Sequence, residues 1–265
     1  MNSELNKKIT VIILSIFLLT SNSFAKQVIE SKITNMDLIS IAGNQRMLSQ
    51  RIAKDYLYAG KNIAYSKANR QLKKSLDDFL STHKKLRASI SDPDIKNLLT
   101  FVELSSNDFK TLINEDFSID NAQLILDLSE SMLEGSQYIF DSLQSTLKIK
   151  ESELIGKSTV QRMLSQRIAK YYISYQSGIK DKNSVDMMKN TVKQFSENLK
   201  SLMKNSTNTP QVNKELKEID KLWRIVHKFY NNIEKGGLPL IVFNSTDNIS
   251  KKMDKVTQMY VAIHK

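Results

Sequence analysis

The stretch QRMLSQRIAK occurs twice in this chain, at residues 45–54 and again at residues 161–170. All ten residues are identical, whereas most of the sequence around the two copies differs. Buried apolar positions tolerate substitutions that conserve volume, so packing alone does not account for identity that includes glutamine, serine and arginine. The decamer therefore marks an internal repeat and indicates a specific polar geometry.

The offset of 116 residues between the decamers also aligns apolar positions further along the chain. The matched pairs are Leu76 with Val192, Phe79 with Phe195, and Leu86 with Leu202. If a few residues are inserted near EKGGLP, the later pairs are Leu128 with Ile249 and Met132 with Met253. We therefore predict a duplicated unit, with the first copy at residues 26–150 and the second at residues 151–265.

The fold class predicted is all-α, because only seven glycines and three prolines interrupt long periodic segments. Each unit is expected to form an up-down four-helix bundle. In the first unit the expected helices span about 33–66, 69–90 and 95–114, and a fourth starts near 121. Asp92 is expected to cap the third helix and Asp120 the fourth.

The junction between the units is rich in helix-forming residues and has no proline between Leu124 and Gly178. We therefore predict one long continuous helix that joins the two bundles end to end, with Gly156 as the expected site of any bend. A straight junction would separate the decamers and favour a homodimer. A bend would let one chain pair its own copies, and the sequence leaves both arrangements open.

The first 25 residues have the features of a signal peptide. Lys7 and Lys8 precede the apolar run VIILSIFLL, and Ser23 and Ala25 are the small residues of a cleavage site. The run is shorter than the roughly 20 residues that a spanning helix needs. We expect a periplasmic or secreted protein, or alternatively one anchored to the inner membrane by an uncleaved segment. The absence of cysteine excludes a disulfide framework.

The formal net charge of +11 is compatible with anionic partners. Most lysines are scattered among acidic residues, which is typical of a solvated surface, and no motif for nucleic acid is present. The three histidines (His83, His227 and His264) are far apart and lack ligand neighbours at helical spacing. No nucleophile or phosphate-loop motif occurs, so we expect no enzyme activity, no catalytic residue, no metal site and no cofactor.

On a helix, Arg46 shares a stripe with Ser49 and Gln50, whereas Arg51 points about 140° away. Arginine carries a permanent charge and forked donors that suit oxyanions. One interpretation is an anion site built from the same arginine of two paired helices, with serine and glutamine beside it. The other interpretation is that the arginines bond to acidic residues or helix carbonyls, so that the decamer serves packing.

The extended stretch IAGNQRMLSQRIAK (residues 41–54) resembles the signature of the N-terminal sensor domain of type IV pili methyl-accepting chemotaxis transducers (PilJ-type). It is also similar to the periplasmic motif of nitrate/nitrite sensor kinases (NarX-type). The shared pattern falls on Ala42, Gly43, Arg46, Met47, Ser49 and Arg51. The second copy has Ser158 and Thr159 in place of the first two of these residues. The nitrate motif differs at Gln45, Leu48 and Gln50, so the PilJ-type pattern is the closer match.

The resemblance implies extracytoplasmic ligand sensing without enzyme activity. It implies that Arg46 and Arg162 contact a small anion and that Arg51 and Arg167 support them. The residues beside the contacts would be Ser49, Gln50, Ser165 and Gln166. We expect the module to lack a signalling domain of its own. We therefore expect it to act through a membrane receptor or sensor protein, or alternatively as a structural or protein-interaction accessory of the envelope or pilus.

Overall fold

The computed structural model describes residues 33–148 and 153–263 of the chain, in which the regular secondary structure is helical. The predicted signal peptide, residues 1–25, lies outside this part. The first four long helices are α2 (Asn35–Gly60), α3 (Tyr65–Ser89), α4 (Pro93–Leu112) and α5 (Ile119–Thr146). The remaining helices are α6 (Glu153–Gln176), α7 (Lys182–Met203), α8 (Pro210–Asn231), the short 3₁₀ helix η1 (Ile233–Lys235) and α9 (Pro239–Ile263). The predicted all-α class is confirmed.

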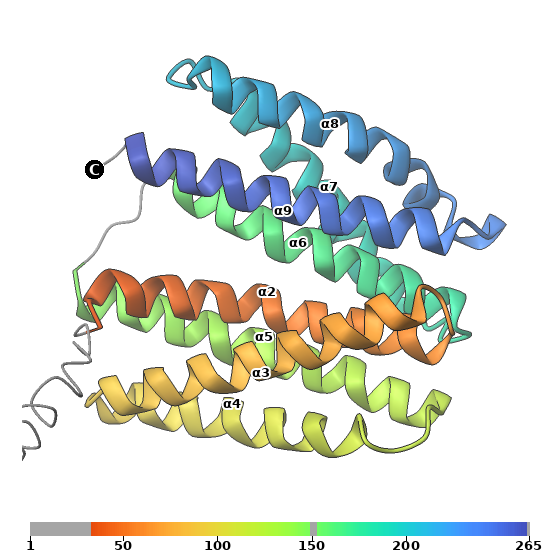
Figure 1. Cartoon of the computed structure of the whole chain (residues 1–265), viewed down its shortest axis with the longest axis horizontal. Helices are drawn as coiled ribbons and strands as arrows, with labels where there is room; N and C mark the ends of the chain where they lie inside the picture. Colours follow the sequence, from red (N-terminus) through yellow and green to blue (C-terminus); the bar gives the residue numbers. More distant parts are fainter. Residues whose placement is uncertain (1–32, 149–152, 264–265) are drawn as a thin grey trace, which may run out of the picture. The chain divides into compact units, whose positions relative to one another are not determined.

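The helices form two sets of four, in which consecutive helices run antiparallel (Figure 1). The first helix set comprises α2 to α5, and α2 packs against both α3 and α5. The second helix set comprises α6 to α9, and α6 packs against both α7 and α9. The boundary predicted between residues 150 and 151 falls outside the described residues and stays a prediction.

Several helix ends follow from local side-chain chemistry. The Asp92 carboxylate accepts hydrogen bonds from the backbone N–H groups of Asp94 and Ile95, which confirms it as the cap of α4. The cap of α5 is Ser118, which accepts from the backbone N–H of Asn121, so the expectation that Asp120 caps this helix was wrong. The first helix is shorter than expected because Asn62 and Ala64 have positive φ angles of 56° and 50°, which a helix cannot accommodate.

The predicted continuous helix between the two sets does not form. α5 ends at Thr146, and Lys148 has a φ angle of 52°, in the left-handed region. Gly156, the expected site of a bend, lies inside α6. Because the chain turns after α5, α6 packs alongside α2, so the predicted end-to-end stacking of the bundles is also wrong. The argument for a homodimer that rested on a straight junction no longer applies.

Burial along the last helix of each set shows how the two sets correspond. The buried positions of α5 recur in α9 at an offset of 117 residues. The pairs are Ile125 with Val242, Leu126 with Phe243, Ser129 with Thr246, Met132 with Ile249, and Ile139 with Val256. The sequence match of Leu128 with Ile249 was therefore displaced by about one helical turn. A displacement of one turn keeps apolar residues on the same face, so periodicity alone did not detect it.

Candidate functional site

The two decamers lie on α2 and α6, which pack against each other and are the central helices of their sets. The conserved glutamines make equivalent contacts. Gln45 Nε2 donates to the carbonyl oxygen of Phe79 at 3.3 Å, and Gln161 Nε2 donates to that of Phe195 at 3.0 Å. All four positions obey the 116-residue offset. Both glutamines therefore tie the first helix of a set to the second, which gives their identity a structural reason.

The serines of the decamers also have matching roles. Ser49 Oγ donates to the carbonyl oxygen of Arg46 at 2.9 Å, and Ser165 Oγ donates to that of Arg162 at 2.8 Å. These are local bonds to the preceding helical turn. The hydroxyl hydrogens are thus used within the helices, so neither serine is free to donate to a ligand.

The lysines that end the decamers are fully buried and reach across to the opposite helix set. Lys54 Nζ on α2 lies 2.6 Å from Asp247 Oδ1 on α9. Lys170 Nζ on α6 forms an ion pair with Glu130 on α5 and donates to Ser129 Oγ at 2.9 Å. A buried charge needs a partner because desolvation disfavours it strongly. Each set therefore supplies a carboxylate to the other set's lysine, and Asp55 of its own set also lies 3.1 Å from Lys54 Nζ.

These ion pairs perturb the acidities of their members. Burial alone would raise the pKa of Glu130, but Lys170 and Arg167 outweigh it and lower that pKa to about 2. Burial lowers the pKa of Lys170 to about 8, with Glu130 opposing the shift. The pKa of Asp247 is likewise well below its usual value because Lys54 outweighs the effect of burial. Both carboxylates are therefore ionised at neutral pH.

The first arginines of the two decamers have different surroundings. Arg46 is buried, donates from Nη1 to Gln137 Oε1 at 2.8 Å, and stacks over the Phe140 ring with 3.9 Å between Cζ and the ring centroid. Arg162 instead lies 3.0 Å from Asp254 Oδ1 and donates from Nη2 to Asn44 Oδ1 at 3.0 Å. Gln137 and Asp254 correspond to each other at the 117-residue offset. The equivalent neighbour is thus neutral beside Arg46 and acidic beside Arg162.

The second arginines also differ. Arg167 forms a side-on ion pair with Glu130. Arg51 lies 3.7 Å from Asp55, and its Nε is buried with no hydrogen-bond partner among the described residues. Asp55 is fully buried, and burial raises its pKa to about 6, with Lys54 opposing the shift. Arg51 therefore faces a weaker acidic partner than Arg167 does.

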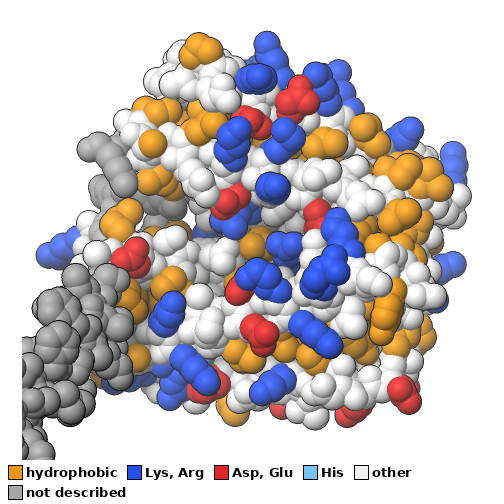
Figure 2. All heavy atoms as spheres, viewed as in Figure 1, with side chains coloured by type: hydrophobic (Ala, Val, Ile, Leu, Met, Phe, Trp, Pro, Cys, Tyr) orange, Lys and Arg blue, Asp and Glu red, His pale blue; other side chains and the backbone are white. Residues whose placement is uncertain are grey.

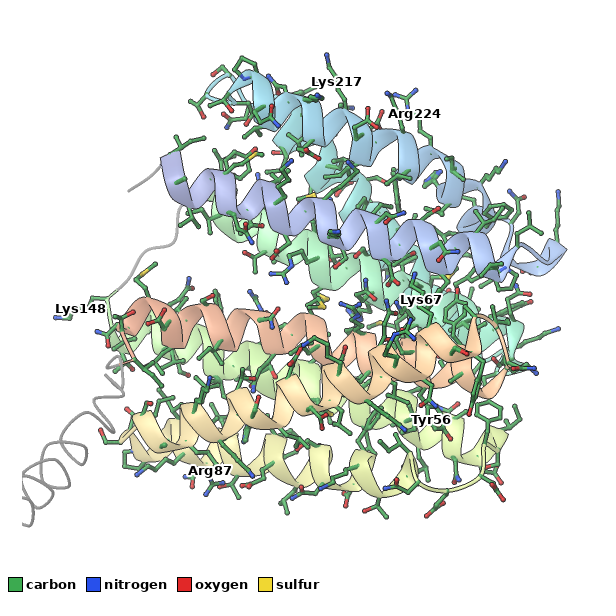
Figure 3. All side chains as sticks on the ribbon, in the orientation of Figure 1. Tyr56, Lys67, Arg87, Lys148, Lys217 and Arg224 are labelled. Atoms are coloured by element: carbon green, nitrogen blue, oxygen red, sulfur yellow. The ribbon has the colours of Figure 1, made fainter. Side chains whose placement is uncertain are left out.

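A pocket of about 390 Å³ opens where four helices meet, α2, α3, α6 and α9. Its lining residues are Met47, Arg51, Lys67, Gln71, Arg162, Asp247, Asn248, Ser250, Lys251 and Asp254. Figure 2 shows Lys and Arg side chains gathered over the boundary between the two helix sets. Figure 3 shows Lys67 extending from the start of α3 toward α9. Four cationic side chains line the pocket and only two carboxylates do, so it attracts anions.

The carboxylates of the pocket are already engaged. Asp247 contacts Lys54, lies 3.1 Å from Lys67 Nζ and accepts from Gln71 Nε2 at 2.9 Å. Burial lowers the pKa of Arg162; Asp254 opposes this shift and the charge of Arg51 adds to it. Arginine remains charged in proteins at neutral pH, so the lowered pKa of Arg162 does not remove its charge. An anion near Arg51 and Arg162 would relieve the repulsion between them.

A second pocket of about 510 Å³ lies against α7 and α8 and includes Lys200, Trp223 and Arg224. Arg224 is paired there with Asp220 at 2.8 Å, so its charge is compensated within one helix. No residue of either decamer lines this pocket. The pocket between the helix sets is therefore the stronger candidate site.

The structure distributes the predicted site residues unevenly. Arg162 lines the pocket, and so does Arg51, which was expected only to support the site. Arg46 is not among the lining residues. Gln50 donates to the carbonyl oxygen of Ser129 at 2.9 Å, while the side-chain amide of Gln166 is buried without a hydrogen-bond partner among the described residues. Arg167, also expected to support the site, is occupied by Glu130.

Sequence reasoning missed four charged residues of the pocket, namely Lys67, Lys251, Asp247 and Asp254. They lie on α3 and α9, far from the decamers in sequence, and no motif marks them. A signal was present for the buried lysines, because the decamer identity extends to Lys54 and Lys170. Their burial was not foreseen because lysine is almost never fully buried unless it is paired.

The fold places the chain among all-α helical-bundle proteins. A family model for the N-terminal domain of type IV pili methyl-accepting chemotaxis transducers (PilJ) matches residues 36–105 and 148–256. The match covers more than half of the chain, and the chain belongs to this family. Domains of this family are sensory modules of chemotaxis transducers, are not enzymes and are typically extracytoplasmic. No curated protein and no solved structure matches the chain significantly.

Within residues 33–148 and 153–263, no helix is both long enough and apolar enough to cross a membrane. The same part of the chain contains no group of three or more His, Cys, Asp or Glu side chains that would suit a metal ion.

Proposed function

We propose that this chain is an extracytoplasmic, periplasmic sensory module that binds a small anion in the pocket between its two helix sets. The contacts would be Arg51 and Arg162, with Lys67 and Lys251 at the pocket wall. The family supplies the sensory class, and the predicted signal peptide favours the periplasm. The main observation in favour of anion binding is that one arginine from each decamer lines the same pocket, which holds four cationic side chains.

The pocket has the properties that an anion site requires. Guanidinium groups bind oxyanions through forked, charge-assisted hydrogen bonds, which are about twice as strong as neutral ones. Arg51 Nε and Arg162 Nε are both buried without hydrogen-bond partners among the described residues. An unsatisfied buried donor is unfavourable, so a ligand that accepts from these groups gains their full interaction.

The experiment is thermal unfolding of the purified protein with nitrate, nitrite, sulfate, phosphate and short carboxylates. Binding to the native state alone raises the melting temperature as the ligand concentration increases. We expect a rise with at least one anion that is absent in Arg51→Gln and Arg162→Gln. The matched control is Arg70→Gln, which removes one exposed charge of α3 close to the pocket without removing a lining residue. If every anion leaves wild type unchanged, the proposal is wrong.

We further propose that the two helix sets are copies of one unit, related to the sensor domains of the NarX type. The matching glutamine and serine contacts support this relationship. Because α2 and α6 pack together within one chain, the two decamers meet without a second copy.

A second candidate function is docking to a receptor or pilus protein, which exposed apolar side chains on α4 and α5 favour. Phe101, Leu104 and Tyr138 are 49%, 61% and 53% exposed. Exposed apolar patches mark interaction sites when they are contiguous. The same thermal experiment discriminates between the two functions, because a docking role predicts no effect of any small anion. Substituting Leu104 by Lys should then abolish capture by the partner.

A further inference from the structure

The two helix sets present equivalent cationic pairs to each other. In α2 the pair is Arg51 and Lys54, and in α6 it is Arg167 and Lys170, at the same positions of the decamer. Each pair faces an acidic residue of the opposite set, Asp247 for the first pair and Glu130 for the second. The two acidic residues correspond at the 117-residue offset, so the two arrangements are directly comparable.

In the second arrangement, a carboxylate of the chain itself occupies the hydrogen-bonding edge of the arginine. Glu130 accepts from Arg167 Nε at 3.2 Å through Oε1 and from Arg167 Nη2 through Oε2, and Lys170 also contacts Oε1. This is the bidentate geometry in which arginine recognises carboxylates. The low pKa of Glu130 agrees with a tightly held anion. No room for another anion remains at the recognition edge of Arg167.

In the first arrangement the corresponding side chain is one methylene shorter. Asp247 reaches Lys54, Lys67 and Gln71, so its two oxygens are taken up by other donors. Arg51 is left with Asp55 at 3.7 Å, which is beyond hydrogen-bond distance. The pocket opens beside Arg51. Glu130 occupies the position beside Arg167. The corresponding position beside Arg51 is therefore not occupied by a carboxylate of the chain.

We propose that the pocket binds one organic carboxylate per chain, held side-on by Arg51 as Arg167 holds Glu130, with Arg162 as the second cation. This inference rests on the proposed function and specifies its ligand class and stoichiometry. The volume of about 390 Å³ supports an organic acid over an inorganic ion, because it falls in the range of small-molecule pockets. Lys251 and Lys67 at the wall would accommodate a second acidic group of a dicarboxylate.

The test is calorimetric titration of the purified protein with acetate, succinate and citrate, compared with nitrate, sulfate and phosphate. We expect at least one carboxylate to bind with a stoichiometry of one per chain. The decisive variant is Asp247→Glu, which adds the methylene that Glu130 has, so that the chain's own carboxylate reaches Arg51. We expect it to weaken carboxylate binding about tenfold or more.

A matched control is Asp186→Glu, which adds the same methylene to a partly exposed aspartate of α7 that is paired with Lys182. It should bind as wild type does. Urea unfolding must show that Asp247→Glu is as stable as wild type, because a new ion pair should not weaken the fold. If that variant fails to fold, Arg51→Gln takes its place, and carboxylate binding should again be lost.

Each other outcome has a distinct meaning. Binding of nitrate or sulfate without any carboxylate would overturn the ligand class while leaving an anion sensor. Binding of two carboxylates per chain, or wild-type affinity in Asp247→Glu, would overturn the inference that Glu130 occupies Arg167 while Arg51 is left for a ligand. A protein that binds none of the six anions would overturn the proposed function itself.

Discussion

Arg51 and Arg162 line the same pocket, although they are the second arginine of one decamer and the first of the other. The charge of Arg51 adds to the lowering of the pKa of Arg162 that burial causes. Two guanidiniums that repel each other in a pocket are stabilised by an anion between them. Their juxtaposition follows from the side-by-side packing of α2 and α6.

We predict opposite consequences for the first arginines of the two decamers. Arg162→Gln should abolish the anion-dependent rise in melting temperature and change stability little, because its partner Asp254 is 39% exposed and loses little on becoming unpaired. Arg46→Gln should leave the anion response intact and lower the free energy of unfolding by about 1–2 kcal/mol, because the stacking on Phe140 is lost. Thermal shift and urea unfolding of the two variants measure both quantities.

The comparison is informative because both changes are chemically identical. An anion response that vanishes in Arg46→Gln and persists in Arg162→Gln would place the site at the other arginine. Equal losses of response and stability in both variants would indicate that the arginines serve packing alone.

The ion pair between the buried Lys170 and the partly exposed Glu130 should be essential to the contact between the two helix sets. Glu130→Gln leaves the fully buried Lys170 without its counter-charge, and we expect a loss of about 3 kcal/mol in the free energy of unfolding. The double variant Lys170→Met with Glu130→Leu should recover part of this loss, because no fully buried ammonium group is then left without a counter-charge. Urea unfolding measures both, and a single variant as stable as wild type would contradict the assignment.

The two glutamines Gln45 and Gln161 should contribute equally to the free energy of unfolding. Gln45→Leu and Gln161→Leu each remove a bond from the first helix of a set to the carbonyl of Phe79 or Phe195. A net loss of about 1 kcal/mol is expected in each case. Chemical unfolding measures both losses. A large loss in only one variant would show that the two decamers are not structurally equivalent.

The all-α fold with two sets of four helices could be predicted from the sequence because apolar periodicity recurs at a fixed offset and few prolines or glycines interrupt it. The packing of the sets could not, because α5 ends at Thr146 and Lys148 adopts a left-handed conformation in a segment rich in helix formers. Two of the four cationic residues of the candidate site were likewise not predictable from the sequence. Arg51 and Arg162 were visible in the decamer, but Lys67 and Lys251 join them only through the packing of α3 and α9.

The assignment of the two arginine roles needed the structure for a related reason. Both decamers have the same sequence, so nothing in them distinguishes the arginine that is paired with a carboxylate of the opposite set from the arginine that is not. The difference lies in the opposite set, where Glu130 and Asp247 differ by one methylene. That correspondence depends on the 117-residue offset, which burial reveals and sequence periodicity missed by one turn.

The stability of the fold should depend on the protonation of Asp55. Burial raises the pKa of Asp55 from 3.8 to about 6, against the opposing charges of Lys54 and Arg51 and with the support of Asp247. An acid whose pKa is higher in the folded state is more favourable there when it is protonated. Its ionisation therefore costs stability at neutral pH, and this cost disappears as pH falls from about 6 toward 3.8. The shift corresponds to about 3 kcal/mol.

We expect the free energy of unfolding to rise as pH is lowered from 7.5 to about 5. It should fall below about 4.5, because Glu130 and Asp247 take up protons there in the unfolded chain, whereas their ion-paired carboxylates in the fold do not. Asp55→Asn imitates the protonated acid, so it should be more stable than wild type at pH 7.5 and lack the rise. Asp77→Asn, at an exposed position of α3, is the control and should follow wild type. Urea unfolding at a series of pH values measures the profiles. A wild-type profile that falls steadily from pH 7.5 would show that Asp55 is ionised in the fold without cost, and that Lys54 and Arg51 outweigh its burial.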